Sequence, residues 1–264
     1  SFGRNNAFSR AGQQAGGAFS LAFGKQLGVA AAAVGSAAFL KSSVSAASDL
    51  SEQVAKSGQV FRDSADDVVA WSKTTADAFG VSQRAALTAA ATFGNLLEST
   101  GLFPSEAAQM SRKLVELAAD LASFNNANPE DVLLALRSGL VGEAEPLRRF
   151  GVLLSEARVQ QEAMAESGKK SVKSLTDGEK AIARYHLILK DTATAQGDFA
   201  RTSDGAANAG RRLSANIDDL KTNVGSGLVP ALARATGLLA DLTGAMKTAS
   251  ITADDLINPR AERN

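Results

Sequence analysis

The stretch PSEAAQMSRKLVELAADLASF, residues 104–124, is the most regular part of the chain and indicates its fold class. Its apolar residues recur at steps of three and four, which places them on one face of an α-helix. They are Met110, Leu114, Leu117, Ala118, Leu121 and Phe124. Ser105 can accept hydrogen bonds from the first free backbone N–H groups, and Glu106 suits the positive end of the helix dipole. We therefore expect an amphipathic helix that begins at Ser105.

The segments on either side predict two further helices with short connections. One opens at Val81-Ser82 after Gly80 and stops before Gly101. The other is capped by Asn128, carries proline at its first position, where the missing N–H costs nothing, and runs to Gly142. Short turns between helices imply antiparallel neighbours, so residues 81–141 predict three packed helices.

The composition extends this expectation to the whole chain. Hydrophobic residues make up 45% of it but aromatic residues only 5%, and alanine, the best helix former, is abundant. We expect an all-α fold: a multi-helix antiparallel bundle, a C-terminal coiled-coil-like helix and an apolar Gly/Ala-rich N-terminal segment. The expected parts are a flexible lead-in plus apolar helix at 1–43, the bundle core at 44–200, an interrupted coiled-coil helix at 201–250 and a tail at 251–264.

The segment 201–250 carries the most periodic apolar pattern. Its heptad spacing is interrupted once, at Gly225-Ser226-Gly227, and Pro230 is expected to kink the helix or begin a new one. Heptad stripes pack on other helices, so we expect contacts between copies of this chain, with a trimer favoured. The predicted contact residues are Leu213, Ile217, Leu220, Val224, Leu232, Leu239 and Leu242.

Residues 16–40 form the longest apolar region. A bilayer-spanning helix needs about 20 apolar residues, and this region reaches that length only if Lys25 is included. Three interpretations stay open: a helix packed in an assembly, a latent membrane-inserting segment, or a cleaved signal. The residues that would enter a membrane are Leu27, Val29, Val34, Phe39 and Leu40.

Composition also excludes several kinds of chemistry. Basic and acidic residues balance at 28 each, so no bulk positive field favours nucleic acid, and we expect no sequence-specific binding to it. The chain has no cysteine and only one histidine, His186, which excludes thiolate catalysis and a metal site with two histidines from one chain. Neither GSGLVP (225–230) nor GKKS (168–171) completes a nucleotide-binding loop, so no cofactor is expected.

Candidate catalytic carboxylates are better explained as structural. The adjacent pairs Asp66-Asp67, Asp218-Asp219 and Asp254-Asp255 diverge on a helix and predict solvated surface. Glu143, Glu145, Arg148 and Arg149 cluster between two apolar runs, where a short helix with Pro146 in its first turn would place acids first and arginines a turn later. This pattern predicts a helix corner; a partner contact or a lytic glutamate are the alternatives.

Several stretches together resemble the core region of phage tail tape measure proteins. They are AADLASFNN (118–126), GLVGEAEPLRRFGVLLSEARVQQEA (139–163), residues 77–101 and 106–124, and the segment that begins EKAIARYHLILKD at 179. The resemblance covers about residues 45–235. It implies a long helical protein, oligomeric inside the tail tube, that sets tail length, contacts the tail tube, distal tail and tip proteins, and assists genome ejection, in some cases at the host membrane.

The sequence and this resemblance together predict a structural virion protein located in the tail lumen or tail tip, not an enzyme. No catalytic, cofactor or metal site is implied. A membrane-inserting pore module for DNA passage is the first alternative, with the host membrane as its location. A cell-wall-degrading enzyme that uses Glu143 is the second, and no muramidase or peptidase motif supports it.

Overall fold

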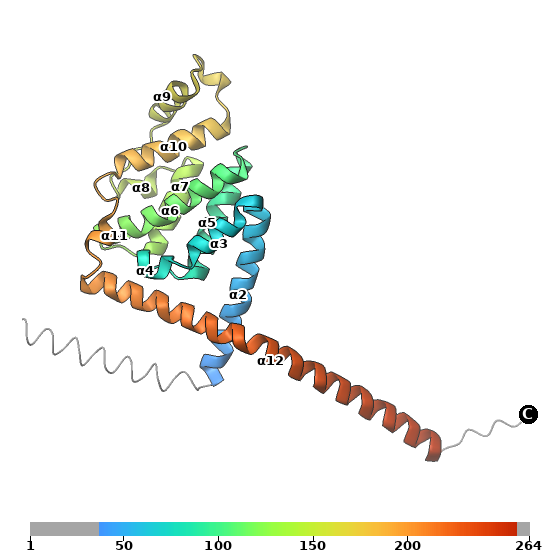
Figure 1. The fold of residues 1–264 in the computed structure, drawn as a ribbon. Helices are drawn as coiled ribbons and strands as arrows, with labels where there is room; N and C mark the ends of the chain where they lie inside the picture. Colours follow the sequence, from blue (N-terminus) through green and yellow to red (C-terminus); the bar gives the residue numbers. More distant parts are fainter. Residues whose placement is uncertain (1–36, 258–264) are drawn as a thin grey trace, which may run out of the picture. The chain divides into compact units, whose positions relative to one another are not determined.

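The computed structural model describes residues 37–257, with side chains from 38 to 230 and at Arg234. This part of the chain is all-α and contains no strand, as the composition predicts (Figure 1). The helices are α2 (Ala37–Phe61), η1 (Arg62–Ser64), α3 (Ala65–Ser72), α4 (Thr75–Phe79), α5 (Gln83–Ser99), α6 (Pro104–Phe124), α7 (Pro129–Val141), α8 (Glu145–Arg148), α9 (Glu156–Ser167), η2 (Val172–Ser174), α10 (Asp177–Asp191), α11 (Asp198–Arg201) and α12 (Ala206–Ile257).

The chain divides into two compact units. Within the described residues, one comprises residues 48–222 and contains the helical bundle, and the other comprises residues 37–47 with 223–257. Helices α2 and α12 each contribute residues to both units. Each unit is described separately.

Helix α6 is the central helix of the bundle. Figure 1 shows α5, α6 and α7 side by side, and α6 packs against both neighbours. Residues 117–122 are all buried, including Asp120, so the second half of α6 is covered on every side, whereas Gln109 and Lys113 of its first half are exposed. A helix covered in this way over half of its length belongs to the core. The three consecutive helices predicted over residues 81–141 are therefore present.

The caps of two of these helices match the prediction, and one does not. Ser82 accepts from Ala85 N–H at the start of α5, and Asn128 accepts from Glu130 N–H at the start of α7. Helix α6, however, begins at Pro104 rather than Ser105, and the Glu106 carboxylate accepts from the backbone N–H of Phe103. Proline at the first position favours this earlier start, because its fixed φ already suits the helix.

One predicted member of the α6 stripe is wrong. Phe124, the last residue of the helix, is exposed, whereas Leu114, Leu117 and Leu121 are fully buried. Phe124 is the last residue of the helix, and periodicity alone does not show whether a neighbouring element covers the end of a stripe.

A close approach fixes the corner after α7. A Cβ added at Gly139 would clash with the Leu147 side chain, so the absence of a side chain lets α8 pack directly on α7. Leu147 is fully buried and Phe150 nearly so, and Gly142 ends α7 with a φ of 103° that suits glycine. This short helix packs against α7, its neighbour in the chain.

Helices α9 and α10 form a second layer joined by polar contacts. Thr176 and Glu179 form the predicted capping box at the start of α10. At the other end of the pair, Arg158 of α9 donates two hydrogen bonds to the Asp191 carboxylate, at 2.6 and 2.7 Å. Asp191 also accepts from the backbone N–H of Leu153, so it ties the loop before α9 to the end of α10.

Helix α12 is one continuous helix that passes through Gly225, Gly227 and Pro230. Pro230 therefore does not begin a new helix, which was one of the two outcomes expected for it. In the smaller unit, a Cβ at Gly225 would collide with the Ser43 carbonyl group and the Ala47 methyl. This part of α12 thus crosses the first turns of α2 at backbone contact distance, which explains why glycine interrupts the heptad pattern there.

Candidate interaction surface on helix α12

The first part of α12, residues 206–222, contacts the bundle through a polar face. Asn208 is buried, and its amide donates to the hydroxyls of Ser123 on α6 and Thr202, both at 2.8 Å. Arg211 donates to the Asn208 amide oxygen at 2.6 Å and to the backbone carbonyl of Ala127 at 3.2 Å. The only buried apolar residue of this part is Ala215. Hydrogen bonds, rather than apolar burial, therefore define this contact.

One turn further along, two aspartates bind the start of α5. Asp218 accepts from the Ser82 hydroxyl at 2.8 Å and forms an ion pair with Arg84 at 3.1 Å. Asp219 accepts from the backbone N–H of Gln83 at 2.8 Å. The first turn of a helix has free N–H groups and a positive partial charge, so two carboxylates stabilise it.

The prediction that the acidic pair Asp218-Asp219 is solvated is wrong. Both residues are half-buried and bind neighbouring groups. Burial raises the pKa of Asp219, and the nearby carboxylates of Asp218 and Asp77 raise it further, while the Gln83 N–H and Arg84 act in the opposite direction. The sequence contained a signal for this contact: polar residues at 208, 211, 218 and 222 recur at steps that return to one helix face.

The predicted apolar stripe lies on the opposite face of the same helix. Residues 213 and 215 differ by two positions, or about 200° of rotation, so Leu213 points away from the buried Ala215. Ile217 and Leu220 follow Leu213 at steps of four and three. Leu213 and Ile217 are half-buried and Leu220 is 50% exposed. The helix thus turns its polar face to its own bundle and part of its apolar face to water.

The remaining predicted contact and membrane residues are described only in part. Val224 is half-buried in the smaller unit. Leu232, Leu239 and Leu242 lie within α12, but their side chains fall outside the described residues. In the predicted membrane segment, Phe39 is half-buried and Leu40 partly exposed, both in α2, whereas Leu27, Val29 and Val34 lie outside the described residues.

The charged cluster at residues 143–149 forms the predicted helix corner. Glu145 pairs with Arg148 across α8 at 2.7 Å, and Arg149 approaches Asp131 of α7 at 3.7 Å. Glu143 is exposed. The guanidinium of Arg149 also lies over the Phe150 ring, 4.7 Å from its centre. These contacts join neighbouring elements at the surface, and the two glutamates do not converge on a cavity.

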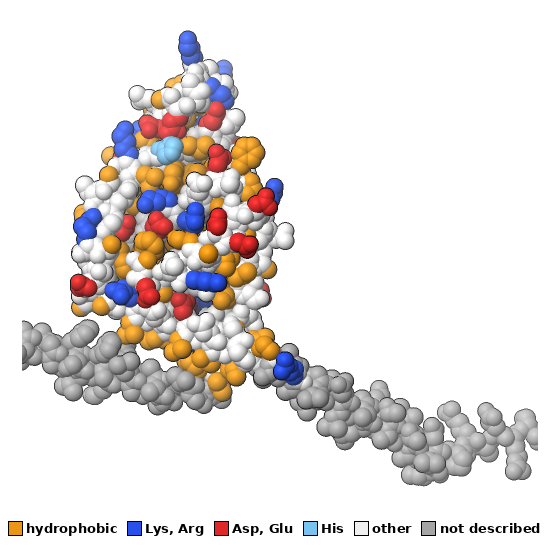
Figure 2. Space-filling model, in the orientation of Figure 1, with side chains coloured by type: hydrophobic (Ala, Val, Ile, Leu, Met, Phe, Trp, Pro, Cys, Tyr) orange, Lys and Arg blue, Asp and Glu red, His pale blue; other side chains and the backbone are white. Residues whose placement is uncertain are grey.

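Two further ion pairs lie on α9, α10 and the loop between them. His186 of α10 contacts the Glu166 carboxylate of α9, and Lys169 binds Glu179 at 2.8 Å, which lowers the pKa of that carboxyl. Among the side chains that the structure describes, no cluster of three histidine or acidic residues could hold a metal ion. Within the described part of the chain, no helix has the length and apolarity needed to cross a bilayer. Figure 2 shows acidic and basic side chains interspersed over one face, with apolar ones between them.

Comparison with protein-family models, with curated proteins and with solved structures found no match.

Proposed function

We propose that this chain is a structural protein of a phage tail, the helical core of a tape measure, and that it associates with copies of itself through the apolar stripe of α12. The observation that carries the proposal is the orientation of α12 between residues 206 and 222. The polar residues of this segment bind the bundle, and Leu220 stands 50% exposed on the other side.

This orientation favours an assembly role because it leaves the apolar stripe available. An amphipathic helix of a monomeric protein normally turns its apolar stripe to the core. Here the stripe continues in heptad spacing along a helix that extends to Ile257, so a second and third copy could pair with it as a coiled coil. Tail tube, distal tail and tip proteins are the proposed further partners, on the resemblance described above.

Light scattering during size-exclusion chromatography tests the self-association. The wild-type chain is expected to form an oligomer, with a trimer favoured, whose fraction rises with concentration. Leu220→Asp should shift it toward the monomer, because a charge in a helical seam is not compensated. Val172→Asp is the matched control, since Val172 is an exposed apolar residue outside α12. A wild-type chain that stays monomeric at high concentration would contradict the proposal.

The location in the tail needs a separate measurement. Electron microscopy of tails that carry a labelled copy of the chain should place the label inside the tube or at its tip. A label elsewhere in the particle would contradict the structural role. Dye release from lipid vesicles that is lost when residues 16–40 are deleted would instead favour the membrane-inserting module.

A further inference from the structure

Helix α7 has apolar residues on two opposite faces. The inner face is buried and consists of Val132, Ala135, Leu136, Gly139 and Leu140. The outer face carries Leu134 and Val141, which are 60% and 50% exposed, and the half-buried Leu133. These three residues share one stripe with Glu130 and Arg137, because positions separated by three, four, seven and eleven lie on one side of a helix.

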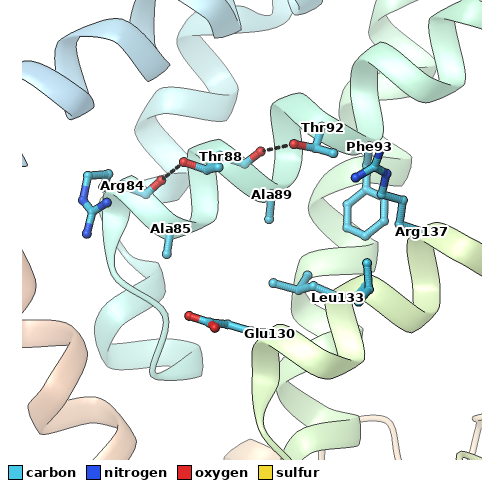
Figure 3. A pocket seen from close by; sticks show the side chains of 10 residues that line it. Arg84, Ala85, Thr88, Ala89, Thr92, Phe93, Glu130, Leu133 and Arg137 are labelled. Carbon is cyan, nitrogen blue, oxygen red and sulfur yellow. Dashed lines mark hydrogen bonds between the residues drawn. The ribbon is translucent and has the colours of Figure 1, made fainter. Parts of the chain in front are cut away.

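The outer stripe of α7 borders a groove. This groove has a volume of about 400 Å³ and lies between α5 and α7, with Phe93 among its lining residues. The middle of the α5 wall consists of short side chains, Ala85, Thr88, Ala89 and Thr92, with Arg84 and Phe93 at its ends (Figure 3). The α7 wall carries Leu133 and Leu134. Short side chains let another helix approach closely. The protruding Leu134 therefore lies beside a site that could accept a leucine from another helix.

Two charges mark the ends of the α7 wall. Glu130 and Arg137 stand at opposite ends with Leu133 between them (Figure 3). Within the described residues, neither the Glu130 carboxylate nor the Arg137 guanidinium forms a hydrogen bond or ion pair. Along the helix, positions 130 and 137 are equally far from the midpoint between positions 133 and 134. If two α7 helices lie antiparallel about that midpoint, Glu130 of each copy faces Arg137 of the other.

We propose that the outer stripe of α7 and the α5–α7 groove form a two-fold symmetric contact with a second copy of this chain. In this contact each α7 lies over the groove of the other copy, and each Leu134 packs near Ala85 and Ala89. The partner is a second copy of the chain because one surface carries all the complementary groups. It has a protruding leucine and a groove that could accept one, and it has an acidic and a basic side chain. Such self-complementarity is what a two-fold interface requires.

This contact is independent of the α12 stripe and of a role in a phage tail. The residues involved belong to α5 and α7, and none of them lies on α12. The test therefore uses chains that carry Leu220→Asp, so that association through α12 does not contribute. Sedimentation equilibrium at low salt then reports the α7 contact alone.

Charge reversal provides the main experiment. Glu130→Arg or Arg137→Glu alone should weaken dimerisation by about tenfold or more, since each change replaces two attractive pairs by two repulsive ones. The double variant Glu130→Arg with Arg137→Glu should restore the dimer. Glu143→Arg, a change at an exposed glutamate outside the groove, should have no effect. A chain that remains monomeric, or a double variant that is as weak as the single ones, would overturn the proposal.

Disulfide trapping gives a second readout that does not depend on affinity. The chain contains no cysteine, so a single introduced one reports its own position. An equimolar mixture of a Leu134→Cys chain and an Ala85→Cys chain is expected to form a covalent dimer under mild oxidation, because the contact places Leu134 of one copy near Ala85 of the other, and Glu130→Arg should slow it. Phe103→Cys, at an exposed apolar residue outside the groove, is the control and should not dimerise. A mixture of the two chains that stays monomeric would refute the two-fold contact, and resistance of the introduced cysteines to alkylation would show that another segment or partner covers the groove.

Discussion

The pair formed by Asp191 and Arg158 offers a quantitative test of the contacts that hold α9 against α10. The two side chains meet through parallel hydrogen bonds of 2.6 and 2.7 Å, and the Asp191 side chain is only 14% exposed. Asp191 also accepts the Leu153 N–H at 3.1 Å. Asp191→Asn keeps the shape of the side chain but removes its charge and presents an NH₂ group to a guanidinium that can only donate.

The size of the effect follows from these contacts. A hydrogen bond to a charged group contributes about 1.5–3 kcal/mol, and partial exposure of Arg158 reduces the value of the second bond. We expect Asp191→Asn to lower the free energy of unfolding by about 2 kcal/mol. For a domain of this size, about 1 kcal/mol corresponds to about 2–4 °C in Tm, so Tm should fall by about 4–8 °C.

The pH dependence gives the sharper measurement. The hydrogen bonds from Arg158 lower the pKa of Asp191 below its ordinary value. A depressed carboxyl pKa contributes stability above the unfolded-state pKa of about 3.9, and this contribution is lost as the pH falls through the folded-state pKa. Urea unfolding should therefore separate wild type from Asp191→Asn near neutral pH, and the two curves should converge in acid.

A variant at an exposed ion pair provides the matched control. Glu145 and Arg148 lie 2.7 Å apart, as close as the first pair, but both side chains are mostly exposed. Glu145→Gln should change stability by less than about 0.5 kcal/mol, because water screens the pair. Two outcomes would contradict this reasoning: equal effects of Asp191→Asn and Glu145→Gln, or an effect of Asp191→Asn that persists unchanged in acid. In either case burial would not explain the contribution of the Asp191–Arg158 pair to stability.

Three further predictions concern single positions. Gly139→Ala should destabilise the bundle by about 1–3 kcal/mol in urea unfolding because its methyl overlaps Leu147, whereas Gly58→Ala, in a helix with open space around it, should be neutral or stabilising. Asp120→Ala should cost about 2 kcal/mol or more, since two backbone N–H groups of the α11 segment lose their buried acceptor, and hydrogen exchange at those amides should accelerate. Burial raises the pKa of Asp219, so its contribution to stability is present at low pH and is lost as the pH rises through the folded-state pKa; Asp219→Asn should remove that part of the pH profile measured by thermal unfolding.

The helices of the bundle could be predicted because their signals are local. Ser82, Asn128 and the Thr176–Glu179 pair act on amides within a few residues, so the sequence alone places these helix starts within a residue or two. The continuous course of α12 could not be predicted in the same way. Gly225 and Pro230 discourage a helix locally, yet the close crossing with Ser43 requires glycine inside one.

The contacts of α12 show a second limit. Apolar spacing identifies a stripe on a helix but not the surface that the stripe faces. Leu220 belongs to the predicted stripe and is half exposed, whereas Asp218 and Asp219, predicted to be solvated, bind the start of α5. Their role depends on Ser82 and Gln83, which are more than a hundred positions away in the chain, so no local pattern reports it.

The polar contacts of residues 206–222 affect the order in which parts of the protein unfold. Contacts made of hydrogen bonds and ion pairs, with Ala215 as the only buried apolar residue, resist denaturant less than a packed apolar layer does. Early in a urea titration this segment should detach from the bundle. Proteases should then first cut near Gly205, just before α12 begins. Fragments from brief digestion would then end at that point while the tryptophan fluorescence of the remaining bundle is still native.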